Sequence, residues 1–355
     1  MNTKSSQGGY ILLLTLLVMS LVVVIAVQIY YTSSGFTSFC QVAVARERAK
    51  VLALSGVQMM RSTLSMAAEK KQKTDAVLKA GKPGTGPVEP SQLPTAQFLR
   101  TIIPILNRWQ KVTVVDQSTT GVLSMYLACD DGKFLLNGVL TKLGFKQFSE
   151  SAKKCTRDIM AMVAKNIGAK TDLSGSLYAF FQQRKGVWFN EVTEVLKVPG
   201  FEAFENRVFV PLKQEAPEKV QTVYLTDLFT SRAKSGTLNP WVLSASVRVA
   251  LGLNQQGEGD VAGQDLEGAL KKFKRTFNWK IDWNTILKPL YGKDFQSLPK
   301  GITSWLSTNC EPMFFSVLVH AQVDGITQRL YALLARDEQR EDGSVVFNIM
   351  KVYWI

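Results

Sequence analysis

The longest apolar pattern of the chain lies near its start. Tyr10 to Tyr31 contains no Asp, Glu, Lys, Arg or His, and Lys4 is the only charged side chain before it. About 20 apolar residues in a helix, at about 1.5 Å each, cross the roughly 30 Å hydrocarbon core of a bilayer. Backbone groups in hydrocarbon must pair within their own segment, so residues 10–31 are predicted to form a transmembrane helix.

The helical pattern continues beyond this stretch. Apolar residues recur at spacings of three, four or seven, as on one face of a helix. The predicted inner face consists of Val44, Val51, Leu54, Val57, Met60 and Leu64. The opposite face carries Arg48, Lys50, Gln58 and Arg61. We therefore expect one helix to leave the membrane, run through residues 32–80 and pack on a globular head.

Three hypotheses compete for this N-terminus. A cleaved secretory signal has an apolar core of about 7–15 residues, which is shorter than this one. A plain uncleaved anchor usually ends in a polar linker, whereas here no charge follows until Arg46. A type IV pilin-like N-terminus is cut by a prepilin peptidase after a Gly that precedes the apolar run. That hypothesis predicts a leader at residues 1–9 and processing between Gly9 and Tyr10.

The remaining pattern predicts a sheet that is built from both ends of the head. After a Gly- and Pro-rich linker at residues 81–95, strands are predicted at 112–115, 121–128 and 134–136. Asp130-Asp131-Gly132 predicts a hairpin between the last two. The final 45 residues alternate as an antiparallel meander, with turns at Asp324-Gly325 and Glu341-Asp342-Gly343.

Helical patterns occupy the middle of the chain. Helices are predicted over residues 149–168, 171–184, 189–197 and 240–252. Asn239-Pro240 resembles a helix start, because Asn caps and Pro suits the first helical position. The predicted organisation is a first part of the head at 96–137, an inserted helical domain at 138–254, and an acidic loop with the rest of the head at 255–355. The fold class is α+β: a pilin-like N-terminal helix packed on an antiparallel sheet, with a large helical insertion.

Several segments resemble the K-type minor pseudopilins of type II secretion systems, the general secretion pathway protein K family. They are residues 130–137 (DDGKFLLN), 192–201 (VTEVLKVPGF), 225–228 (LTDL) and 238–243 (LNPWVL). In the last segment Pro240-Trp241 departs from the family's Asn-rich motif. Most pilins carry a Glu five residues after the cut, whereas this chain has Leu14 there, as do pilin-like proteins that lack the Glu.

The resemblance implies a structural protein without enzymatic activity, at the tip of the type II secretion pseudopilus. It implies nucleation of pseudopilus assembly, support of protein export across the outer membrane, and N-methylation after cleavage. The chain would be anchored once in the bacterial inner membrane with its head in the periplasm. Expected partners are the I- and J-type minor pseudopilins and the major pseudopilin. Packing with partner helices is expected at Leu14, Leu17, Leu21 and Val24.

The tip position has a physical reason. In most pilins the Glu neutralises the N-terminal amine of the neighbouring subunit above. A first subunit has no such neighbour, and an unpaired carboxylate in hydrocarbon is costly. An apolar residue such as Leu14 therefore suits the first subunit.

The net charge of +13 raises a second hypothesis, a nucleic-acid-binding component of a DNA-uptake or type IV pilus system. The turn Val198-Pro199-Gly200 also resembles the hairpin of helix-hairpin-helix modules, whose backbone N–H groups contact phosphate. The basic residues are scattered, however, and no basic stripe alternates with aromatic residues. Solvated helix faces explain the charge better, and a helix connector explains the turn better.

The four cysteines, Cys40, Cys129, Cys155 and Cys310, match no zinc pattern. Four cysteines permit three full pairings. A disulfide between Cys129 and Cys310, which flank predicted strands, is one prediction, and buried thiols are the alternative.

The sequence offers few candidate metal ligands or catalytic residues. Family members bind calcium, and the acidic loop could supply some of the oxygen ligands that calcium needs. Those candidates are Glu258, Asp260, Asp265 and Glu267, with a solvated loop as the alternative. His320 is the only histidine and lies in no nucleophile motif, so a third hypothesis, an anchored periplasmic enzyme, lacks a catalytic constellation.

Overall fold

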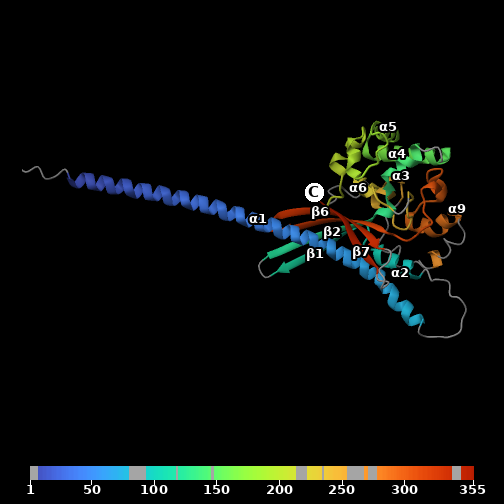
Figure 1. The fold of residues 1–355 in the computed structure, drawn as a ribbon, viewed down its shortest axis with the longest axis horizontal. Coiled ribbons are helices and arrows are strands. Elements are labelled where there is room, and N and C mark those ends of the chain that lie inside the picture. Colours follow the sequence, from blue (N-terminus) through green and yellow to red (C-terminus); the bar gives the residue numbers. More distant parts are fainter. Residues whose placement is uncertain are drawn as a thin grey trace, which may run out of the picture.

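One long helix dominates the shape of the molecule. The computed structural model describes residues 7–79, 93–116, 119–144, 148–212, 222–233, 236–253, 268–270, 278–337 and 345–355. Helix α1 (Gln7–Lys79) projects far beyond the rest of the chain, and its second half lies along a sheet (Figure 1). The short helix α2 (Leu93–Ile102) packs beside α1.

The sheet has five antiparallel strands in the order β1-β2-β5-β6-β7. They are β1 (Trp109–Asp116), β2 (Thr119–Cys129), β5 (Phe314–Val323), β6 (Ile326–Asp337) and β7 (Val346–Trp354). β2 and β5 are neighbours although residues 130–313 separate them, with Gly121 opposite Val323 and Cys129 opposite Phe315. The sheet is therefore closed by a long-range pairing, and everything between these two strands is an insertion into it.

The C-terminal meander is confirmed. Asp324 and Gly325 join β5 to β6 with φ of 49° and 80°. Positive φ at both central residues is the type I′ geometry that suits the twist of a two-residue hairpin. The other predicted turn, Glu341-Asp342-Gly343, lies outside the described residues.

The insertion consists of short elements. They are β3 (Phe134–Leu135), α3 (Leu136–Gly144), α4 (Glu150–Ile167), α5 (Leu173–Gln183), α6 (Leu225–Leu228), β4 (Phe229–Thr230), α7 (Ala245–Ala250), α9 (Trp279–Asp282) and α10 (Lys288–Tyr291). Short 3-10 helices join them at Asp130–Gly132, Val192–Lys197, Phe201–Arg207, Phe295–Ser297 and Ile302–Ser304, and a short π-helix lies at Trp283–Leu287. The helical part thus continues past residue 254. Together these observations confirm the predicted fold class.

The predicted inner face of α1 is correct only in its second half. The buried predicted residues are Val57, Met60 and Leu64. The exposed ones are Val44, Val51 and Leu54. The stripe that meets the sheet instead includes Ala45, Ala49 and Ala53, because small side chains let a helix lie close to strands. Arg61, predicted to face solvent, is half-buried, and its Nε donates to the carbonyl of Phe347 at 2.6 Å.

Two glycines lie where the helix approaches the sheet closely. A Cβ on Gly56 of α1 would lie 2.9 Å from Leu123 Cδ1 and 3.0 Å from Val319 Cγ1. A Cβ on Gly121 of β2 would lie 2.8 Å from Leu52 Cδ2. Glycine at these positions allows the backbones to approach without displacing buried side chains.

The predicted hairpin at Asp130-Asp131-Gly132 is wrong. These residues form a single 3-10 turn, and Phe134–Leu135 pairs in parallel with Phe229–Thr230 in a separate two-stranded sheet. Both carboxylates are buried and bonded within the fold, so the segment acts as a buried joint and not as a solvent-exposed turn.

The helix start predicted at Asn239-Pro240 is also wrong. Asn239 Oδ1 accepts from the backbone N–H of Trp241 at 3.1 Å, which is a local Asx turn. Ser244 caps α7 instead, since its Oγ accepts from the N–H of Val247 at 3.2 Å. The helix predicted at 189–197 is a shorter 3-10 helix at Val192–Lys197.

The helix predicted at 149–168 is confirmed as α4. The Ser149 hydroxyl accepts from the N–H of Ala152 at 3.2 Å, and Gly168 ends the helix with φ of 76°. The helix predicted at 171–184 is confirmed as α5, which Asp172 caps through the N–H of Ser174. In both cases the cap lies within three residues of the N–H that it binds, because capping is a local property.

Candidate functional site

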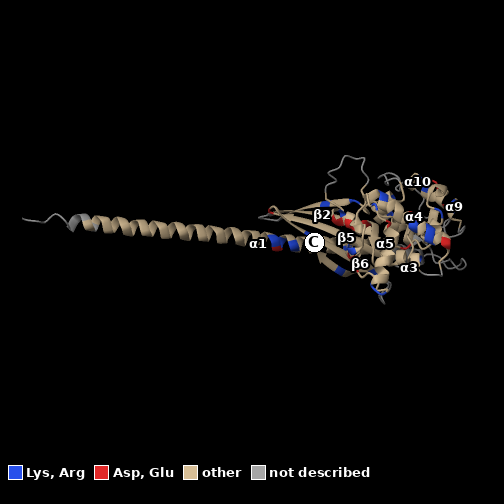
Figure 2. Cartoon of the chain, turned by 90° about the horizontal axis from the view of Figure 1, so that it is seen from above, with Lys and Arg blue, Asp and Glu red and all other residues tan. Residues whose placement is uncertain are grey.

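The first candidate is the projecting half of α1. Every side chain described between Leu12 and Phe39 is exposed, and the helix first buries a residue at Ala45. In Figure 2 the described projecting part of α1 is tan, without the blue or red of charged residues, and the sequence places the first charged residue of α1 at Arg46. The helix contains a stretch long and apolar enough, at mean hydropathy 2.9, to cross a membrane.

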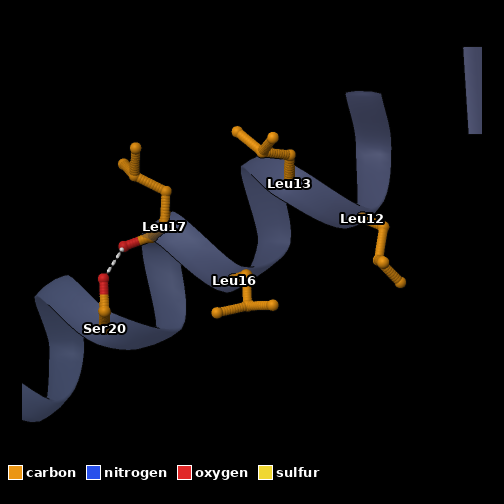
Figure 3. A pocket seen from close by; sticks show the side chains of 5 residues that line it. All are labelled: Leu12, Leu13, Leu16, Leu17 and Ser20. Atoms are coloured by element: carbon orange, nitrogen blue, oxygen red, sulfur yellow. Dashed lines mark hydrogen bonds between the residues drawn. The ribbon is translucent and has the colours of Figure 1, made fainter. Parts of the chain in front are cut away.

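Two hydroxyl groups in this stretch are paired within the helix. Thr15 Oγ1 donates to the carbonyl of Leu12, and Ser20 Oγ donates to that of Leu17, both at 2.8 Å. Figure 3 shows the second bond beside a shallow hollow lined by Leu12, Leu13, Leu16, Leu17 and Ser20, all on one helix. A hydroxyl that bonds to its own helix exposes no unsatisfied donor to hydrocarbon.

The predicted packing residues lie on one face of this helix by their spacing. Their exposed fractions are 51% for Leu14, 58% for Leu17, 56% for Leu21 and 59% for Val24. Met19 is exposed by 71%, so burial within the monomer does not single out this face. Packing with partner helices stays a prediction.

The predicted processing site lies in the first turns of α1. Gly9 is helical, and the side chain of Tyr10 is 71% exposed. A protease could reach this segment without unfolding the head, and cleavage there stays a prediction.

The predicted metal and disulfide sites are not assembled by the described part of the chain. Glu258, Asp260, Asp265 and Glu267 lie outside the described residues. Within the described residues, no three His, Cys, Asp or Glu side chains gather in a way that could hold a metal ion. No disulfide joins Cys129 to Cys310: the Cys129 thiol donates to the carbonyl of Phe314 at 3.4 Å, and that of Cys310 to Thr308 at 3.6 Å.

The turn Val198-Pro199-Gly200 connects two 3-10 turns of the insertion. Gly200 has φ of 92°, and a Cβ there would lie 2.1 Å from Thr171 Oγ1. Its N–H donates to the Glu202 carboxylate. A phosphate would have to compete with that carboxylate for the same N–H, so the geometry favours a connector over a nucleic-acid contact.

His320 is buried on β5 against Trp109, with ring centroids 5.1 Å apart. Burial, with a smaller contribution from the Arg329 guanidinium, lowers the pKa of His320 to about 4. The imidazole is therefore neutral and packed at ordinary pH, as expected for a structural histidine.

The second candidate is a polar cluster at the base of the insertion, which the sequence did not predict. Lys133 Nζ lies 2.7 Å from Asp130 Oδ1, and the two side chains are exposed by only 1% and 2%. The same ammonium donates to Ser316 Oγ on β5 at 2.6 Å, and Thr230 Oγ1 donates to Asp130 Oδ2 at 2.9 Å. The ion pair thus links the insertion to the sheet.

The electrostatics of Lys133 follow from this pairing. Burial alone lowers the pKa of a lysine, but the Asp130 carboxylate, with Tyr331 and Asp227, outweighs it. The pKa of Lys133 is therefore raised, and the residue is charged at any physiological pH. Asp131 completes the joint, because its Oδ2 accepts from the N–H groups of Met313 at 2.6 Å and Phe314 at 3.0 Å.

Segments far apart in the sequence meet at this joint. The carbonyl of Asp131 accepts from the N–H of Asn239 at 2.7 Å, and a Cβ on Gly132 would lie 1.9 Å from the carbonyl oxygen of Val242. Asp227 accepts from the Tyr126 hydroxyl at 3.2 Å. Burial, and then the Asp227 carboxylate, raise the pKa of Tyr126 well above its ordinary value.

Three of the family-like segments, 130–137, 225–228 and 238–243, therefore converge on one buried polar joint. Its residues hold the insertion against the sheet, which is a structural role. Paired acids directly before a short apolar run were the one sequence signal that could have indicated it.

The described residues define an α+β protein whose long helix lies on an antiparallel sheet and projects beyond it. No family model matches the chain, and no curated protein matches its sequence. Among solved structures, a chain of the GspK-GspI-GspJ complex from the type 2 secretion system of enterotoxigenic Escherichia coli is similar, with a TM-score of 0.46 and 11% identity. The alignment covers 88% of this chain and 98% of that one. At this identity no residue's role carries over.

Proposed function

We propose that the chain is a minor pseudopilin of a type II secretion system, anchored in the inner membrane with its head in the periplasm. The observation that supports this most is α1 (Figure 2). The described side chains of its uncharged part are exposed from Leu12 to Phe39, and the same helix packs on the head from Ala45 to Ala68. Apolar surface of this extent must lie in lipid or against other helices.

The proposed role is assembly and not catalysis. Helices of the I- and J-type minor pseudopilins and of the major pseudopilin pack along the face of Leu14, Leu17, Leu21 and Val24. The complex then nucleates the pseudopilus, and subunits added below lift it to support protein export. Leu14 in place of a Glu suits a first subunit, because no amine above it needs a carboxylate.

Processing by a prepilin peptidase tests the proposal first. The full-length chain is expressed with a prepilin peptidase, and the mass and N-terminal residue of the product are measured. We expect loss of residues 1–9 and an N-methylated Tyr10. Gly9→Leu should abolish the cut, whereas Gly8→Ala should leave it intact. A wild-type product that retains its leader would contradict the proposal.

Helix packing is tested by cysteine cross-linking in membranes that contain candidate partners. Cys40 of α1 is first replaced by Ser, because it is the one cysteine of the chain that is not fully buried. Leu17→Cys should then cross-link to a partner helix carrying its own cysteine. Met19→Cys, on the opposite face by helical spacing, is the control. Equal cross-linking of the two variants would show that the proposed face is not an interface.

A further inference from the structure

A second hollow, of ≈ 440 Å³, lies in the insertion and is used by no part of the proposed function. Leu135, Phe148 and Trp188 supply apolar parts of its lining, and Asn137 and Thr141 supply polar ones. Among the described residues that line it, Lys142 of α3 is the one charged side chain. The hollow therefore combines apolar walls with a single cation.

Lys142 is unusually placed for a lysine. It is only 4% exposed, and its Nζ donates to the carbonyl of Gly236 at 2.8 Å. The ammonium lies 4.2 Å from the centre of the Trp305 ring and 5.5 Å from that of Phe148. Among the described residues, no carboxylate pairs with it, in contrast to buried Lys133 beside Asp130.

The other polar groups of the hollow are already bonded to the protein. The amide of Asn137 bonds to the backbone N–H and carbonyl of Phe189, and the hydroxyls of Thr141 and Ser304 donate to backbone carbonyls. The ammonium of Lys142 has three N–H donors. Among the described residues, the Gly236 carbonyl is the one hydrogen-bond acceptor that it reaches. The unused donors can therefore serve a ligand.

We propose that this hollow binds a carboxylate carried on an apolar body, with the carboxylate on Lys142 and the body against Phe148 and Trp188. A buried cation is stabilised most by an anion placed within hydrogen-bond reach. With one cation in the lining, a monoanion matches the charge. Burial lowers the pKa of Lys142. A lowered pKa is expected for a buried ammonium without a neighbouring anion, because burial disfavours its charged form.

The carboxylate could be a free organic acid or the C-terminus of a polypeptide, and both present the same chemistry to Lys142. The test uses calorimetry on the full-length protein in detergent micelles, with empty micelles as the blank. The probes are 3-phenylpropionate and its neutral amide, 3-phenylpropanamide. We expect saturable binding of the acid and roughly 10- to 100-fold weaker binding of the amide.

Variants then locate the site. Lys142→Met should reduce the affinity for 3-phenylpropionate by a similar factor. Lys153→Met on α4 makes the same change of net charge outside the lining of the hollow and should not reduce it. The comparison of acid with amide needs no variant, so the proposal remains testable if Lys142→Met does not fold. Equal affinity for acid and amide, or full affinity in a folded Lys142→Met variant, would overturn it.

A third probe separates the two sources. An N-acetylated dipeptide ending in Phe is compared with the same peptide as its C-terminal amide. Tighter binding of the peptide acid than of 3-phenylpropionate supports a polypeptide C-terminus. Weaker binding supports a free organic acid. Neither result depends on the pseudopilin assignment, which the processing experiment tests separately.

Discussion

Replacing Lys133 with Met should destabilise the protein strongly, because it leaves Asp130 charged and buried. The two side chains are exposed by only 1% and 2% and lie 2.7 Å apart. Removing one partner of a buried ion pair typically costs about 3–5 kcal/mol. The Thr230 hydroxyl at 2.9 Å is the remaining side-chain partner of Asp130 among the described residues, and one neutral hydrogen bond does not replace a cation.

A matched control lies in the same chain. Lys153 and Glu150 form an ion pair with the same i, i+3 spacing and the same 2.7 Å distance, but Glu150 is exposed by 79%. Lys153→Met should therefore leave stability nearly unchanged, since water solvates the remaining carboxylate. The double variant Asp130→Asn with Lys133→Met should recover part of the loss, because it removes both charges.

The assay is urea unfolding of the full-length protein in detergent micelles, followed by tryptophan fluorescence. Trp241, Trp283 and Trp305 are almost fully buried and report on the insertion. The change in the transition midpoint, at a constant slope, gives the change in unfolding free energy. If Lys133→Met and Lys153→Met unfold at the same midpoint, burial of the ion pair does not stabilise the joint.

Three further predictions use the same unfolding assay. Gly200→Ala should cost more than about 2 kcal/mol, because its Cβ would meet Thr171 Oγ1 at 2.1 Å in addition to the strain of a positive φ. Gly168→Ala has a similar φ and nothing within 4 Å, so it should cost only about 1–2 kcal/mol, and equal losses would contradict the clash. Neutral, buried His320 should contribute stability above pH 6.5 that is lost progressively as the pH falls to about 4, by about 3 kcal/mol at most. His320→Gln should flatten that part of the pH profile, and an unchanged profile would refute the assignment. Ser149→Ala should cost about 1 kcal/mol through loss of the α4 cap, and no change in midpoint would refute that role.

The sequence alone determined features that depend on neighbouring residues. An uncharged run such as Tyr10–Tyr31 predicts a membrane-spanning helix whatever the rest of the chain does. The Asp324-Gly325 turn and the Ser149 cap act through bonds and dihedrals within a few residues. The Asp324-Gly325 turn and the helix that begins after Ser149 were confirmed, because no distant partner was needed. The stretch from Tyr10 to Tyr31 is helical, and its place in a membrane stays a prediction.

Only the tertiary structure decided which face of α1 is buried and what Asp130-Asp131-Gly132 does. Val44 and Val51 are more apolar than Ala45 and Ala49, yet the two alanines are buried and the two valines exposed. At Gly56 of the same helix even a Cβ would lie 2.9 Å from Leu123 Cδ1, so the packing of the helix on the sheet favours small residues there. From the sequence, the Asp-Gly pair predicts an exposed turn. In the fold, Lys133 and backbone groups from more than a hundred residues away satisfy both acids. The local sequence around Asp130 and Asp131 does not show which distant groups will pair with them. Only the folded structure therefore shows that these charges are buried.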